Sequence, residues 1–140
     1  MPGSEPQPAG RTSVRLSLPA AASHVRTARL VSVSVARRWG LADLVLDEFR
    51  LAVGEACALV LAGTQDGDVL RLEIADEGGP LTVSVSASPV QPGPDPATPA
   101  ATEDLSLAVL RELVPSLQAL PGRFEMTWPS ASGTSAATIV

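Results

Sequence analysis

The chain has little or none of several residue types, and each shortage excludes a class of protein. Its 140 residues contain no lysine, no asparagine and no tyrosine, and aromatic residues make up only 3%. Ten arginines stand against 15 acidic residues, and the resulting net charge of −5 argues against non-specific nucleic-acid binding. The single cysteine, Cys57, excludes an internal disulfide and fits a reducing compartment.

Long apolar runs and an apolar signal region are also missing. No run approaches the roughly 20 apolar residues that cross a bilayer. The N-terminal stretch MPGSEPQPAGR has no apolar segment of the kind that a secretory signal requires. We therefore expect a soluble, cytoplasmic protein with a disordered N-terminal tail over residues 1–11 and a flexible C-terminal tail over 131–140.

Between these tails, residues 12–130 are predicted to form one domain. Hydrophobic residues make up 45% of the chain, so a core of leucine, valine and alanine is available. Alternating apolar residues predict strands, 3.6-residue periodicity predicts helices, and Pro121-Gly122 predicts a type II turn. The expected elements are strands over 13–18, 70–74, 81–86, 117–120 and 124–128, and helices from Ser23 (as N-cap) to about Trp39, over 43–62 and from Thr102 to 114.

This order predicts an α+β fold: a two-layer sandwich in which three helices cover one face of a single mixed, mostly antiparallel sheet. The helix over 43–62 is apolar almost all round in its second half and should be central. Residues 89–101 contain five prolines, which neither a helix nor a central strand tolerates, so they should form a long loop.

Glu55 is the one charged residue between Arg50 and Asp66. Its neighbours one helical turn away are apolar, among them Leu51 and Leu59. Removing a carboxylate from water costs several kcal/mol in rough terms unless a partner compensates it. Glu55 is therefore a candidate for a residue kept, or inherited, from a site that needed an acid.

Three segments together carry a family resemblance: ARLVSVSVARRWGL, LDEFRLAVGEACALVLAG and LSLAVLRELV. In this element order they resemble the anti-sigma regulatory factors of the RsbW and SpoIIAB type, with MTWP fitting the divergent actinobacterial branch. Those proteins are serine-protein kinases with the ATP-binding fold of histidine kinases. The resemblance implies that fold, ATP and magnesium as cofactors, and Glu55 as the ancestral general base toward a partner serine.

The other positions of the nucleotide site depart from the family pattern. The asparagine that binds magnesium in the family corresponds to Leu59, which has no oxygen to offer the ion. The adenine-binding Asp-x-Gly corresponds to Ala87-Ser88-Pro89, where Ala87 accepts no hydrogen bond and Pro89 fills space. The glycine-rich ATP lid is replaced by the proline-rich loop over 89–101 and by Asp104 at the next helix, whose charge opposes phosphate. We therefore predict no bound cofactor, no metal and an inactive Glu55.

The partner-binding surface of the family is better preserved. Its Ala-Arg pair on the first helix, which contacts the sigma factor and the anti-anti-sigma factor, corresponds to Ala28-Arg29, and Arg26 would extend the patch. The planar guanidinium suits carboxylate or phosphate recognition. A solvated helix face explains Arg29 equally well.

The resulting prediction is a regulatory protein that binds an anti-anti-sigma factor (a STAS domain), a sigma factor, or both, without phosphorylating either. The alternative is an active kinase that binds ATP and magnesium and phosphorylates an anti-anti-sigma factor. A third reading is a dimerisation partner, either of itself or of an active homologue. We expect no nucleic-acid or membrane partner.

Overall fold

The computed structural model describes residues 11–77, 79–89 and 101–129, and the side chains of 13–76, 79–89 and 105–129 within them. The predicted tails and the predicted proline-rich loop lie outside this range, apart from Arg11, which begins the first strand, and the loop's end residues Pro89 and Ala101. None of the helices in the described ranges is long and apolar enough to cross a membrane.

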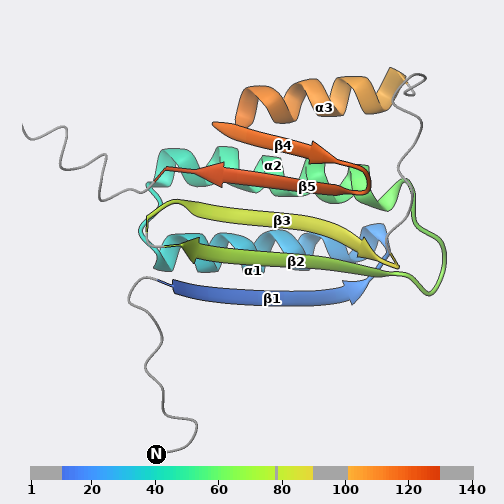
Figure 1. Ribbon diagram of the computed structural model, residues 1–140, viewed down its shortest axis with the longest axis horizontal. Coiled ribbons are helices and arrows are strands. Elements are labelled where there is room, and N and C mark those ends of the chain that lie inside the picture. The colour runs from blue at the N-terminus through green and yellow to red at the C-terminus, as the bar shows by residue number, and fades with distance from the viewer. Residues whose placement is uncertain (1–10, 78, 90–100, 130–140) are drawn as a thin grey trace, which may run out of the picture.

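The protein is a two-layer α+β sandwich, and this prediction of the fold class is confirmed (Figure 1). Five strands form one sheet in the order β1-β2-β3-β5-β4, and the helices lie on one side of it. The elements are β1 (Arg11–Pro19), the 3-10 turn η1 (Ala22–His24), α1 (Val25–Arg38), α2 (Asp43–Leu61), β2 (Val69–Glu77), β3 (Leu81–Ser88), α3 (Ala101–Leu113), β4 (Ser116–Leu120) and β5 (Arg123–Trp128).

The sheet is antiparallel at every pairing, so the expectation of a mixed sheet is wrong in this detail. After β3, the chain returns through α3 and starts β4 in the direction of β3. The tight turn at Pro121-Gly122 then folds β5 back, and β5 inserts between β3 and β4. The positive φ of 68° at Gly122 is what the predicted type II turn requires. The two parallel strands therefore never pair.

Alternation along β3 shows how the sheet separates core from solvent. Its residues alternate between buried and half-buried, with Leu81, Val83, Val85 and Ala87 on the buried side. Side chains of successive strand residues point to opposite faces, so these four face the helical layer. At the centre of the core, the rings of Phe49 and Trp128 lie 4.8 Å apart at 57°, a favourable tilted arrangement.

The start of the first helix differs from the prediction. Ser23 was expected to cap it, but Ser23 lies inside η1 and is exposed. The residue that caps α1 is His24, whose side chain makes no capping hydrogen bond. The extra 3-10 turn shifts the helix start because it leads the chain from the end of β1 onto the helical layer.

Candidate functional site

Glu55 lies in the second half of α2 and is only half-buried. The prediction that α2 is central is confirmed, because α2 packs against α1, α3 and β3. Its buried residues nevertheless occupy one side of the helix. Leu51, one turn before Glu55, is 55% exposed, and Ala58 is also exposed. The carboxylate of Glu55 makes no hydrogen bond or ion pair within the described ranges, and its access to water removes the need for one.

Leu59 follows Glu55 by one turn and therefore lies on the same side of α2. It is half-buried and packs against the hydrophobic core. The position that the resemblance assigns to a magnesium ligand thus holds an apolar side chain that has a packing role. The described part of the chain also contains no cluster of three or more His, Cys, Asp or Glu residues that could hold a metal ion.

Ala87 is 4% exposed and belongs to the core, where it faces the helical layer near the end of β3. Its side chain is a methyl group, so nothing there accepts a hydrogen bond from an adenine amino group. Pro89 follows it and is exposed, with no N–H to donate. The backbone of Asp104 lies in the first turn of α3, and its side chain is outside the described part. These residues do not fit Mg-ATP in the way the resemblance would require.

Arg29 lies between two helices rather than on an open helix face. A Cβ atom added at Gly54 of α2 would come within 3.2 Å of Arg29 Cδ and 3.5 Å of Arg29 Nη1. The arginine side chain therefore lies directly over Gly54, and Arg29 is half-buried. Arg26, one turn earlier on α1, is exposed. The structure keeps the two predicted partner-binding arginines on one helix but gives them different surroundings.

Cys57 lies one turn after Gly54 on α2, and the charge of Arg29 acts on its thiol. The thiol is fully buried, and burial raises its pKa from the ordinary 9.0 to about 12. The positive charge of Arg29 opposes part of that increase, which places the guanidinium close enough to act on the thiol. A protonated, buried thiol is a poor nucleophile, so Cys57 is a core residue, as its apolar neighbours predict.

Adjacent residues on a helix point about 100° apart, so Gly54 and Glu55 face different directions. Arg29 occupies the Gly54 side, where α1 packs, and no ion pair joins it to Glu55. Glu55 belongs to α2, whereas Arg29 belongs to α1 and lies against the Gly54 side of α2. The two side chains therefore lie on neighbouring sides of α2. They do not form one catalytic group.

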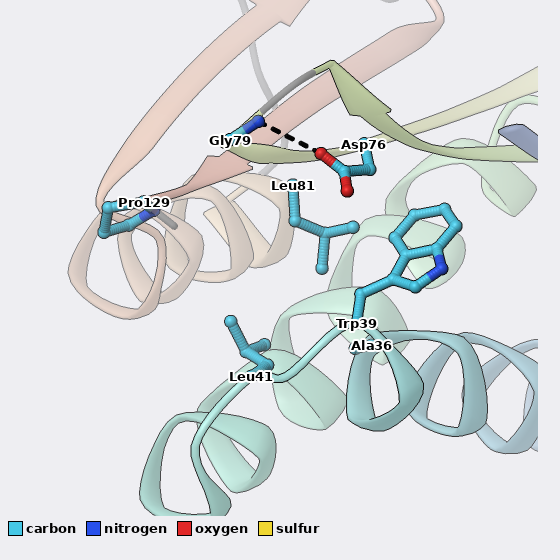
Figure 2. Close-up of a pocket in the computed structure, with 7 residues that line it drawn as sticks. All are labelled: Ala36, Trp39, Leu41, Asp76, Gly79, Leu81 and Pro129. Atoms are coloured by element: carbon cyan, nitrogen blue, oxygen red, sulfur yellow. Dashed lines mark hydrogen bonds between the residues drawn. The ribbon is translucent and has the colours of Figure 1, made fainter. Parts of the chain in front are cut away.

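A small pocket lies at the opposite end of β3 from Ala87 (Figure 2). It contains about 260 Å³ of open space, solvent included, and Trp39, Asp76 and Leu81 are among its lining residues. The Gly79 N–H donates to Asp76 Oδ1 at 3.1 Å, which forms the β2–β3 turn. No pattern in the sequence predicts this pocket, because the end of α1 and the hairpin turn meet only in the folded chain.

Comparison with known proteins agrees with the fold. Residues 18–123 match the family described as the histidine kinase-like ATPase domain. This match spans most of the chain, from the end of β1 to the start of β5, and the chain belongs to that family. No curated protein matches it.

Proposed function

We propose that this chain is a regulatory binding protein on a histidine kinase-like ATPase fold, acting in the manner of an anti-sigma factor. It engages an anti-anti-sigma factor of the STAS type, a sigma factor, or both, and controls transcription by occupancy. It does not transfer phosphate. This reading goes beyond the family match, which supports the ATPase fold alone.

The observation that carries the proposal is that Leu59 and Ala87, which correspond to the magnesium-binding and adenine-binding residues of the resembled family, are apolar. Leu59 and Ala87 both contribute apolar atoms to the core, where a metal ligand and an adenine acceptor would be needed. Phosphoryl transfer depends almost entirely on positioning and neutralising phosphate and metal. A lone, solvent-accessible Glu55 supplies neither.

Partner recognition is supported by the arginines of α1. This helix carries four arginines and no acidic residue, so its charge is uniformly positive. Arg26, Arg37 and Arg38 are exposed, and Arg29 is held at the edge of α2. Such a surface is suited to an acidic patch on a partner, whose approach it would also accelerate.

The decisive experiment pairs nucleotide binding with partner binding on the same purified protein. Isothermal titration with ATP and Mg²⁺ is expected to give no heat up to millimolar concentrations. Titration with STAS-domain proteins and sigma factors of the same source is expected to yield one specific complex. Incubation of that complex with radiolabelled ATP should leave the partner serine unlabelled.

The alternative, an active kinase, would be established by sub-millimolar Mg-ATP binding together with labelling of the partner that depends on Glu55. A Glu55→Gln variant separates enzymatic transfer from contaminating kinase activity, since only the former would disappear. Absence of any STAS or sigma partner would refute the regulatory proposal directly.

A further inference from the structure

Gly54 is an unexpected residue for the middle of a long helix, and it is half-buried there. Glycine in a helix interior destabilises the helix relative to alanine, because it gains more freedom in the unfolded chain. Gly54 has no positive φ that would require glycine. Its near neighbours Ala52 and Ala56 are buried in the core, so alanine is accommodated two residues away on either side.

The reason for glycine lies across the helix interface. The three atoms nearest to a Cβ at this position are Cδ, Nη1 and Cγ of Arg29, at 3.2, 3.5 and 3.9 Å. A contact of 3.2 Å is tighter than most Cβ contacts, so a Cβ here would shift the Arg29 stem by a few tenths of an ångström, and a larger side chain would shift it further. The missing Cβ provides the groove in which the Arg29 stem lies.

We propose that Gly54 is a positioning residue for Arg29, holding its guanidinium low on α2 for a carboxylate of the partner. This inference rests on the proposed function and names its recognition chemistry: an aspartate or glutamate side chain of a protein partner. A stem held in a groove loses little conformational freedom when the guanidinium binds, which favours affinity. The positive charge of Arg29 also acts on the Cys57 thiol, whose pKa it lowers against the effect of burial.

The geometry also explains why Arg26 is not equivalent. Arg26 is exposed on the same helix, and long exposed side chains lose rotamer entropy when they form an ion pair. A half-buried, pre-oriented guanidinium pays less and is screened less by salt. Arg29 should therefore specify the partner, while Arg26 contributes general attraction.

The first test needs no partner. In the intact protein, modification by phenylglyoxal followed by peptide mass spectrometry reports the accessibility of each arginine. In the chain without substitutions, Arg29 should react with phenylglyoxal more slowly than Arg26. Gly54→Ala and Gly54→Leu should progressively raise the reaction rate of Arg29 toward that of Arg26. Gly63→Ala is the matched control, since a Cβ there meets only Val60 O at 3.9 Å. Unchanged Arg29 reactivity in both Gly54 variants would overturn the proposal.

The second test uses the STAS-domain or sigma-factor partner that binds the unmodified chain. Gly54→Ala should weaken that complex about tenfold, the loss expected when a charge-assisted hydrogen bond is misplaced. In an Arg29→Ala background the same substitution should have no effect, because Gly54 acts only through Arg29. Equal losses in both backgrounds would show that Gly54 supports the fold generally and would overturn the proposal.

Thermal unfolding of the single variants keeps the two tests interpretable. Gly54→Ala should unfold no earlier than the unmodified chain, since helix propensity favours alanine. If no partner binds the unmodified chain, the proposed function fails and the assignment of a carboxylate ligand fails with it. The reactivity result then still decides, by itself, whether Gly54 sets the position of Arg29.

Discussion

Two sides of helix α2 have opposite characters. On the side facing α1, Gly54 leaves a groove that the Arg29 side chain occupies closely. On the other, Glu55 and Leu59 present a carboxylate with no described partner and an apolar side chain packed on the core. The first side keeps a specific, costly arrangement, whereas the second has become ordinary core and surface. The proposed function assigns recognition to the first side and no phosphoryl transfer to the second, and the following predictions test that assignment.

The largest effect on stability is expected at Ala87, which corresponds to the adenine-binding position in the resemblance and is buried in the core. Ala87→Asp would bury a carboxylate among apolar side chains and should lower the free energy of unfolding by about 3 kcal/mol. Urea denaturation at pH 7 measures this. Ala119→Asp, at an exposed position of β4, is the control and should be nearly neutral. A stable Ala87→Asp protein that gained ATP binding would show that a nucleotide pocket is open beside β3 and would contradict the description of Ala87 as a core residue.

Charge reversal on the other side tests whether the retained arrangement serves recognition. Arg29→Glu should weaken partner binding about a hundredfold, since it replaces attraction by repulsion at a partly desolvated site. Arg38→Glu makes the same change of charge at an exposed position on α1 and should cost far less. Surface plasmon resonance compares the two. Equal losses would mean that only the net charge of α1 matters.

The buried thiol of Cys57 should make the free energy of unfolding depend on pH. Burial raises its pKa to about 12 in the folded protein, against an ordinary 9.0. The folded state therefore holds the proton over a range where the unfolded chain releases it. The contribution of Cys57 to the free energy of unfolding is fully present below pH 9. It should fall by about 1.4 kcal/mol per pH unit as the pH rises from the ordinary pKa of 9.0 toward the folded-state pKa of about 12.

The composition makes this signature unusually clean. The chain has neither lysine nor tyrosine, so no other side-chain type titrates in that range, since arginine stays charged. Chemical unfolding from pH 8 to pH 11 should show the decline, and Cys57→Ala should flatten it. An identical slope in both proteins would show that the thiol is not protected by burial.

The smallest effect is expected at Glu55. Because its carboxylate is half-exposed and has no described partner, Glu55→Gln should change the free energy of unfolding by no more than about 0.5 kcal/mol. Partner affinity should also be unchanged. Thermal melting measures the stability and the binding titration measures the affinity. A loss of affinity in Glu55→Gln would show that Glu55 contributes to partner binding.

Local patterns predicted most of the architecture. Alternation identified β2 and β3, and Pro121-Gly122 identified the turn between β4 and β5, because strands and tight turns depend on period and on backbone freedom. The start of α1 was misplaced, since the 3-10 turn before it depends on how the chain leaves β1 and not on the capping propensity of Ser23.

The candidate site residues were named from their positions in the sequence, but their environment was not predicted. The motif positions of Glu55, Leu59 and Ala87 were found from the order of residues. Their exposure was not, because it depends on which side of α2 faces the rest of the fold: Glu55 and Leu59 are half-buried, whereas Ala58 between them is exposed. The pocket beside Trp39 was missed altogether, since its walls come from segments far apart in the chain.

The sequence by itself determined the class of fold, the missing oxygen at Leu59, the missing acceptor at Ala87 and the simple titration behaviour of a chain without lysine or tyrosine. These follow from residue chemistry and from periodicities that act over a few residues. Only the tertiary structure decided that Arg29 lies over Gly54. That contact joins two helices, and its meaning depends on the absence of a single Cβ atom, which no pattern within either helix reveals.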